Sequence, residues 1–268
     1  MDYDKLTEKY LKIKPYLNDK ELFYYKFVED FDIENTYHSN AIEGNTLTLM
    51  ETSLVLEGCS IGSKDMRELF EVVNHSKAFN YIFETKDNNK PIIDIEDILK
   101  IHSMILNNID DYNKGVYRRV NVGIRGTNII FPFPNDLPKL MAEFNNWFVE
   151  KQKIGIMHPV ELASKAHFEL VNIHPFIDGN GRTSRLLMNM VLLKNKYPPI
   201  MIKVEEKLEY INALNETRDN KTNAFDKFIY KKMDERLDSL LELSKDFEVE
   251  KDISEKPKSK KKSQDRER

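Results

Sequence analysis

The chain has 268 residues, of which 40% are hydrophobic and 32% are charged, a balance typical of a soluble globular protein. No apolar run approaches the roughly 20 residues of a membrane-spanning helix, and the first residues lack the apolar stretch of a signal peptide. The one cysteine, Cys59, excludes an intrachain disulfide and fits a reducing compartment. We therefore expect a cytoplasmic protein without a membrane partner.

The net charge of −4 is spread unevenly. Residues 251–268 hold eight Lys/Arg and four Asp/Glu, which leaves −8 on the rest of the chain. An acidic body argues against nucleic acid as a partner, because phosphate repels it. Apolar residues are missing after Ile253, so residues 246–268 are expected to form a charged, disordered tail.

Apolar residues recur at helical spacing along most of the chain. The expected helical segments are 3–33, 34–44, 48–56, 64–84, 94–106, a helix from Pro138, 159–172, 181–194, 205–217 and 224–245. Several boundaries carry local signals: Gly44 suits a helix C-cap, Thr48 and Glu51 fit a capping box, and Asp94 suits an N-cap. The pattern predicts an all-α protein with one interruption.

That interruption is at residues 116–134. Val120, Val122 and Ile124 alternate with polar residues, and the β-prone run 129–131 follows a turn sequence. This pattern predicts a β-hairpin. The chain then divides into N-terminal helices (1–90), a core with the hairpin (91–245) and the tail (246–268).

Residues 174–185 concentrate polar chemistry in the sequence His-Pro-Phe-Ile-Asp-Gly-Asn-Gly-Arg-Thr-Ser-Arg, followed by an apolar helical run at 186–193. We interpret the segment as a loop that enters a helix N-terminus. Such a terminus offers unpaired N–H groups and a partial positive charge to an anion. Gly179 and Gly181 would let the backbone approach a ligand closely, since neither has a Cβ.

The charged residues of this segment suit a polyphosphate. Arg182 and Arg185 are three positions apart on one helix face, and their guanidiniums match phosphate oxygens. Asp178 is a carboxylate of the kind that holds Mg²⁺ together with substrate phosphates. His174 titrates near neutrality and is a candidate base.

The pattern His-Pro-Phe-x-Asp-Gly-Asn-Gly-Arg-x-x-Arg at 174–185 resembles the signature of Fic-domain proteins, and the resemblance extends over residues from about 34 to 230. It implies a Fic-fold helical bundle with one β-hairpin flap at 116–134. It further implies transfer of AMP from ATP to a Ser, Thr or Tyr hydroxyl of a target protein, which lies along the flap as an added strand. The similar branch is that of the animal endoplasmic-reticulum adenylyltransferases, whose location and target do not carry over.

The resemblance assigns roles to individual residues. His174 takes the hydroxyl proton, and Asp178 binds Mg²⁺. The phosphate-binding set is Gly179, Asn180, Gly181, Arg182, Thr183, Ser184 and Arg185, with Arg182 on the β-phosphate and Arg185 on the γ-phosphate. The nucleotide-lining set is Ile124, Arg125, Gly126, Thr127, Asn189, Tyr210, Ile211 and Leu214. Helix packing explains Tyr210 and Leu214 equally well, and Arg218 stands where the animal relatives have an asparagine.

A second pattern, Ser39-x-x-x-Glu43-Gly44, resembles the inhibitory motif of Fic proteins. A glutamate at a helix C-terminus is repelled by the helix dipole and needs a compensating partner. The resemblance implies that Glu43 forms a bidentate salt bridge with Arg185, which keeps this arginine from the γ-phosphate. In some family members the same glutamate also positions water to remove AMP, so deAMPylation is a second expected activity.

Two other functions stay open at this point. A Doc-like phosphotransferase shares the fold but has a lysine where this chain has Gly181. A non-catalytic nucleotide-binding regulator would not need His174, which is present. The oligomeric state is also open, a homodimer included.

Overall fold

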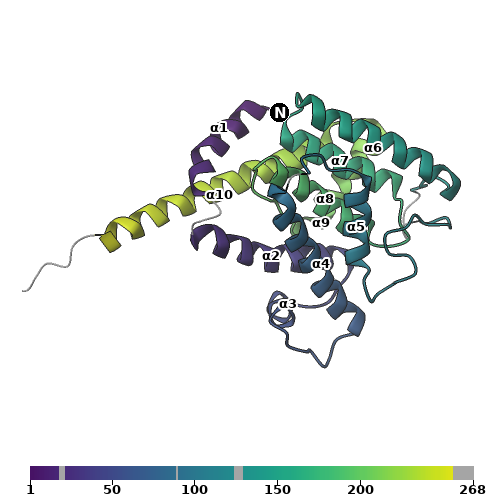
Figure 1. The fold of residues 1–268 in the computed structure, drawn as a ribbon, viewed down its shortest axis with the longest axis horizontal. Helices are drawn as coiled ribbons and strands as arrows, with labels where there is room; N and C mark the ends of the chain where they lie inside the picture. Colours follow the sequence, from purple (N-terminus) through teal and green to yellow (C-terminus); the bar gives the residue numbers. More distant parts are fainter. Residues whose placement is uncertain (18–21, 89, 124–128, 256–268) are drawn as a thin grey trace, which may run out of the picture.

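The structure is a computed structural model that describes residues 1–17, 22–88, 90–123 and 129–255. The α-helices in this part of the chain are α1 (Tyr3–Ile13), α2 (Leu22–Glu43), α3 (Leu49–Leu56), α4 (Met66–Glu84), α5 (Ile95–Ile105), α6 (Leu137–Ile154), α7 (Pro159–Ile173), α8 (Asn180–Lys194), α9 (Lys207–Asn220) and α10 (Ala224–Glu255). No residue in these ranges lies in a β-strand. The predicted all-α class is confirmed (Figure 1).

Helix α8 lies at the centre of the molecule (Figure 1). It packs against α7, and it also contacts α2, α4 and α5. Thirteen of its residues are buried, including Arg182 and Arg185. A helix that is buried on every side must belong to the core, so the motif at its N-terminus has a rigid base.

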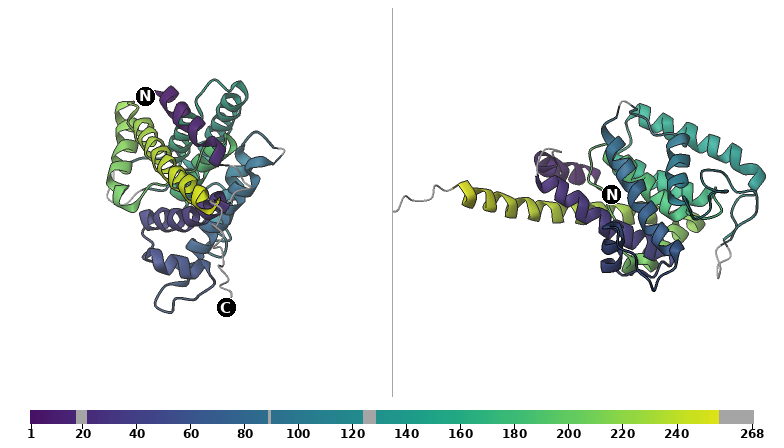
Figure 2. Two further views of the ribbon diagram at one scale, coloured as in Figure 1. Left: turned by 90° about the vertical axis from the view of Figure 1, so that its left-hand side faces the viewer. Right: turned by 60° about the horizontal axis from the view of Figure 1, so that its bottom comes forward.

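The N-terminal helices join the same core. α1 packs along α10, and α2 packs on α4. One continuous set of buried apolar side chains runs from Leu6 to Leu240. α3 projects from one edge of the molecule, where Leu47, Val55 and Val72 form a small cluster of their own (Figures 1 and 2).

Local sequence signals set several helix ends as expected. α2 ends at Glu43, and Gly44 follows with φ +105, a backbone conformation that favours glycine. The Thr48–Glu51 capping box is present, and Asp94 caps α5 through the N–H of Glu96. No helix in the described part of the chain is long and apolar enough to cross a bilayer.

The hairpin prediction is not borne out in the described residues of 116–134, and residues 124–128 lie outside them. The guanidinium of Arg118 takes the place of a strand ladder. It donates from NH1 to the carbonyl of Val120 (2.9 Å) and from NH2 to that of Pro132 (2.7 Å). One side chain thus links the segments 116–123 and 129–134, and neither segment contains a β-strand in the part that the structure describes.

The predicted disordered tail is wrong over its first part, because α10 continues to Glu255. Its C-terminal part extends away from the body (Figures 1 and 2). The sequence from residue 246 contains no proline or glycine before Pro257, so nothing stops the helix from propagating. Residues 256–268 lie outside the described part.

Candidate active site

The motif forms a tight turn between α7 and α8. α7 ends at His174, whose φ of +50 is left-handed and whose N–H donates to Leu170 O at 3.0 Å. α8 begins after Gly179, which has φ +76 and provides no side-chain cap. The N–H groups of the first helical turn are therefore left for a ligand.

The side chain of Asn180 holds this turn closed. Its Oδ1 accepts from Phe176 N (3.0 Å), and its Nδ2 donates to Phe176 O (2.8 Å). Asn180 is buried, so both bonds are shielded from water. Of its groups, only the backbone N–H remains for the expected phosphate contact.

The ring of His174 is oriented as a base. Its Nδ1 lies 3.2 Å from the carbonyl of Val171, which can only accept, so Nδ1 carries the proton and Nε2 keeps its lone pair. Phe131 stacks on the ring at 3.9 Å. Burial lowers the pKa of His174 to about 4, so the imidazole is neutral at neutral pH.

Two residues that the sequence interpretation missed support the turn from outside. Arg118, 3% exposed, donates from Nε to His174 O at 2.8 Å. His102 accepts from Gly115 N at 2.9 Å through Nδ1, so its Nε2 carries the proton and donates to Asp178 O at 3.0 Å. No spacing in the sequence links either residue to the motif. Only the fold brings them there.

Arg185 is held by the end of α2. Its NH2 donates to Glu43 Oε1 (2.8 Å) and to Ser39 O (2.8 Å), and its Nε donates to Ser39 Oγ (2.9 Å). The structure thus joins Glu43 to Arg185, residues 142 positions apart. The expected bidentate geometry is wrong, because the guanidinium divides its donors between Glu43 and Ser39.

The Glu43 carboxylate is partly accessible, with 38% of its side chain exposed, whereas Arg185 is 5% exposed. Burial raises the pKa of Glu43, but the charges of Arg185 and Arg182 outweigh this and hold it below the ordinary value. Glu43 is therefore ionised at neutral pH. Gly181 makes room for it, since a Cβ at this position would overlap Glu43 Oε1.

Arg182 and Asp178 belong to a second ion cluster. Arg182 NH1 lies 3.2 Å from Glu71 Oε1, and its NH2 lies 3.2 Å from Asp178 Oδ1. Arg67 NH2 contacts Asp178 Oδ2 at 2.5 Å. Asn45, two residues after Glu43, donates to Glu71 Oε2 at 2.9 Å. The segment after Glu43 is thus linked to Arg182 through Glu71.

Asp178 suits a cation site in which substrate completes the coordination. No group of three or more His, Cys, Asp or Glu residues in the described ranges could hold a metal by itself. Mg²⁺ commonly binds through one or two carboxylates plus phosphates, and the side chain of Asp178 is 41% exposed. Burial raises its pKa, but Arg182, the Gly179 N–H and Arg67 together hold it below the ordinary value.

For Thr183 and Ser184 the phosphate contact stays a prediction. Both side chains are fully buried, and Thr183 N donates to Gly179 O at 2.9 Å. Their small size suits the tight packing of α8, and neither hydroxyl faces solvent.

The predicted nucleotide-lining residues are only partly described. Ile124, Arg125, Gly126 and Thr127 lie outside the described residues. Asn189 bonds the backbone of Ile200 through both ends of its amide (2.9 and 3.0 Å). Tyr210 is buried with its hydroxyl 3.0 Å from His167 Nε2.

The remaining members lie on α9. Leu214 is buried in the core, and Ile211 is exposed. Arg218 donates to Asn172 and Asn215. Packing thus accounts for Tyr210 and Leu214, and their adenine contact stays a prediction.

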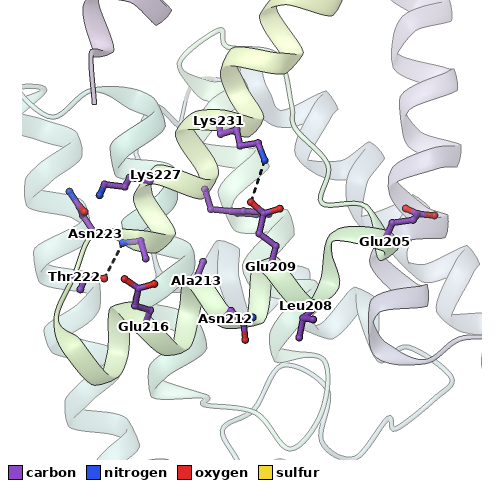
Figure 3. A pocket seen from close by; sticks show the side chains of 12 residues that line it. Glu205, Leu208, Glu209, Asn212, Ala213, Glu216, Thr222, Asn223, Lys227 and Lys231 are labelled. Carbon is purple, nitrogen blue, oxygen red and sulfur yellow. Dashed lines mark hydrogen bonds and ion pairs between the residues drawn. The ribbon is translucent and has the colours of Figure 1, made fainter.

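A groove on the outer side of α9 is separate from this site (Figure 3). It lies between α9 and α10, and the Lys231–Glu209 ion pair (3.3 Å) joins the two helices across it. Its α9 residues include Leu208, Asn212 and Glu216, at a spacing that makes one helix face. Tyr210 and Leu214 lie on the opposite face.

Fold and site together define a helical protein whose central helix offers an open N-terminus and two arginines, next to a neutral histidine at the end of α7. Residues 92–192 match the Fic/DOC family. This part of the chain is therefore a Fic/DOC-family region.

Relatives with established names are similar over most of this chain. It is 35% identical over 215 residues to "Protein adenylyltransferase Fic" of Nematostella vectensis, covering 80% of this chain and 50% of that protein. It is 39% identical over 198 residues to the protein of the same name from Culex quinquefasciatus, covering 74% and 39%. The chain thus spans half the length of these relatives or less.

Solved structures share the fold. A Fic domain containing signaling protein from Bacteroides thetaiotaomicron has a TM-score of 0.81 at 28% identity, covering 90% of this chain and 96% of that chain. Fic-1 from C. elegans has a TM-score of 0.77 at 26% identity, covering 90% and 72%. Both similarities extend beyond the Fic motif to the N-terminal helices.

Proposed function

We propose that this protein transfers AMP from ATP to a hydroxyl group of a target protein, and that Glu43 restrains the reaction. The proposal rests on one observation, that Ser39 and Glu43 already bind the side chain of Arg185. A buried arginine beside an open helix N-terminus is suited to phosphate, and here the end of α2 supplies its partners. The names of the relatives support the same reaction.

The chemistry needs a base, an anion site and a cation. The target hydroxyl oxygen attacks the α-phosphorus, the bond to the bridging oxygen of the β-phosphate breaks, and pyrophosphate leaves. Nε2 of His174 accepts the hydroxyl proton. The N–H groups at the start of α8 and the Arg182 guanidinium would stabilise the charge of the phosphates. Asp178 would hold the Mg²⁺, which supplies positive charge against the phosphate oxygens.

The target would lie along residues 116–134. Ile130 is 89% exposed, and Phe133 and Val120 are also exposed apolar residues. Phe131, between two of them, packs on His174. An extended target peptide would pair with this segment as an added strand. The hydroxyl of the peptide would then lie next to His174.

Glu43 restrains the enzyme because Arg185 cannot bind both the carboxylate and a γ-phosphate. We call the Glu43–Arg185 ion pair the latch. Because Glu43 is partly exposed, the strength of this pair lies between two limits. A surface pair is worth about 0–1 kcal/mol, and disruption of a buried pair costs about 3–5 kcal/mol. Such a latch holds an enzyme mostly off, yet a bound partner can release it. The same accessible carboxylate could orient water for removal of AMP.

Labelling with radioactive ATP in a cell lysate tests this function. With α-labelled ATP, Glu43→Gly should raise protein labelling by roughly 10- to 100-fold, since each 1.4 kcal/mol is tenfold. Adding His174→Ala to this variant should abolish the label. Glu57→Gly is the matched control, since Glu57 directly follows α3 and its carboxylate accepts from Ser53 on the same helix.

Each outcome separates the candidate functions. Equal labelling by the wild type and the Glu43→Gly variant would exclude the latch. Label from γ-labelled but not α-labelled ATP would indicate a phosphotransferase instead. Release of AMP from a pre-labelled target by the wild type, but not by the Glu43→Gly variant, would establish the second activity.

A further inference from the structure

The cation-binding carboxylate is itself occupied in this structure. Asp178 has two oxygens, and both have partners. Oδ1 accepts from the Gly179 N–H at 2.5 Å and from Arg182 NH2 at 3.2 Å. Oδ2 contacts Arg67 NH2 at 2.5 Å. Both Oδ1 partners belong to the motif turn and its helix, so a cation has to take Oδ2, where Arg67 lies.

Arg67 lies at a position where the helix itself disfavours a positive charge. It is in the first turn of α4, directly after Met66, the first residue of the helix. A cation at this end opposes the helix dipole. Its pair with Glu71 at i,i+4, 3.4 Å from Nε to Oε1, has the basic residue first, which is the weaker orientation. The contact with Asp178 is therefore the interaction that accounts for this arginine.

The charges around Arg67 balance without a metal ion. Arg67 and Arg182 face Asp178 and Glu71, two cations against two carboxylates. A divalent cation on Asp178 would make the guanidinium of Arg67 a like-charged neighbour. The side chain of Arg67 is 53% exposed, so it can leave for solvent at little cost, whereas Arg182 is 2% exposed and cannot.

We propose that Arg67 is a second restraint on the enzyme, a built-in competitor that occupies the cation ligand Asp178 until a metal–nucleotide complex displaces it. Glu43 blocks the γ-phosphate position through Arg185, and Arg67 blocks the cation position through Asp178. The two restraints come from α2 and α4, which pack together. This inference rests on the proposed function for the identity of the cation, but the ion pair at Asp178 does not depend on AMP transfer.

Calorimetric binding of the α,β-methylene analogue of ATP tests it without catalysis. All variants carry Glu43→Gly, so that Arg185 is free. Each affinity is measured with Mn²⁺ and again with EDTA, and the ratio of the two affinities reports what the metal adds. Arg67→Gln should raise this ratio by about threefold or more, as expected for removing a half-exposed competing ion pair.

The control removes the same charge elsewhere on α4. Lys77 is exposed and lies ten residues along the helix, roughly 15 Å from Arg67. Lys77→Gln should leave the ratio unchanged, although general loss of positive charge can weaken both affinities. Asp178→Ala should bring the ratio close to one.

The outcomes distinguish this inference from the proposed function. An unchanged ratio in Arg67→Gln, with the metal effect lost in Asp178→Ala, overturns the role of Arg67 and leaves Asp178 as the metal ligand. A lower ratio in Arg67→Gln also overturns it, because Arg67 would then remain with the bound complex. A metal effect that survives Asp178→Ala overturns both the competitor and the metal role of Asp178.

Discussion

The motif turn and the segment that covers it are built differently. The turn at 174–185 is held by buried groups that bond its backbone, those of Asn180, Arg118 and His102. The covering segment, residues 39–71, contacts the motif through side-chain ion pairs and through the hydrogen bonds of Ser39 to Arg185. Its Glu43 and Arg67 side chains are 38% and 53% exposed. The turn is thus fixed, whereas the exposed side chains of Glu43 and Arg67 can move away from it.

This difference separates two kinds of mutation. A change in the turn should damage structure and activity together, since buried backbone groups lose their partners. A change in the covering segment should raise activity and leave the fold intact. Three predictions for labelling are given from the largest effect to the smallest, and a fourth concerns stability.

Asn180→Ala should have the largest effect. It removes two buried hydrogen bonds to Phe176, so the free energy of unfolding should fall by about 2–4 kcal/mol. Labelling in the Glu43→Gly background should fall by roughly 100-fold, because misplacement of the turn costs that order in rate. Urea unfolding and α-labelled ATP measure the two effects.

Asn195→Ala is the matched control for Asn180→Ala. Asn195 is exposed at the other end of α8 and donates to Val191 O at 2.8 Å. Its removal should cost less than about 1 kcal/mol and leave labelling unchanged. Similar effects of the two substitutions would contradict the special role of the turn.

Ser39→Ala should have a smaller effect of the opposite sign. It removes the hydrogen bond from Arg185 Nε to Ser39 Oγ (2.9 Å) and leaves Glu43 in place. Labelling should rise roughly two- to tenfold, as expected for the loss of one hydrogen bond with a net value of about 0.5–1.5 kcal/mol. Ser53→Ala on α3, whose hydroxyl donates to the exposed Glu57, is the control. A rise equal to that of Glu43→Gly would mean that Ser39, not the carboxylate, carries the latch.

The smallest effect concerns pH. Burial lowers the pKa of His174 to about 4, so the base form persists while the pH falls through the ordinary histidine pKa. Labelling by the Glu43→Gly variant should change less than about twofold between about pH 7.5 and about pH 5.5. A tenfold loss over this range would instead indicate a base with an ordinary pKa.

Stability should respond to pH even though labelling does not. The unfolded His174 takes up a proton near pH 6.5, whereas the folded one does so only near 4. The contribution of neutral His174 to the free energy of unfolding is complete above pH 6.5 and is lost as the pH falls towards 4. Burial also lowers the pKa of His75 and His102, so these residues add to the loss of stability at low pH. Thermal unfolding at several pH values measures this loss.

Much of the architecture could be predicted because its signals are local. Gly44, the Thr48 capping box and Asp94 mark helix ends through bonds within a few residues. The hairpin predicted at 116–134 shows no strand in the residues of this range that the structure describes. Alternating residues there favour a hairpin, but the buried Arg118 binds the segments 116–123 and 129–134 through their carbonyls. A tertiary contact of this kind leaves no periodic trace in the sequence.

The sequence by itself determined the helical class, the composition of the motif and the presence of a glutamate that needs a partner. These follow from spacing, because a turn, a cap or a helix face is built from neighbouring residues. Only the tertiary structure decided which groups meet. It divided Arg185 between Glu43 and Ser39, closed the turn through Asn180, and placed Arg67 on Asp178. Those contacts join residues as far as 146 positions apart, a distance over which only packing of the helices around α8 can act.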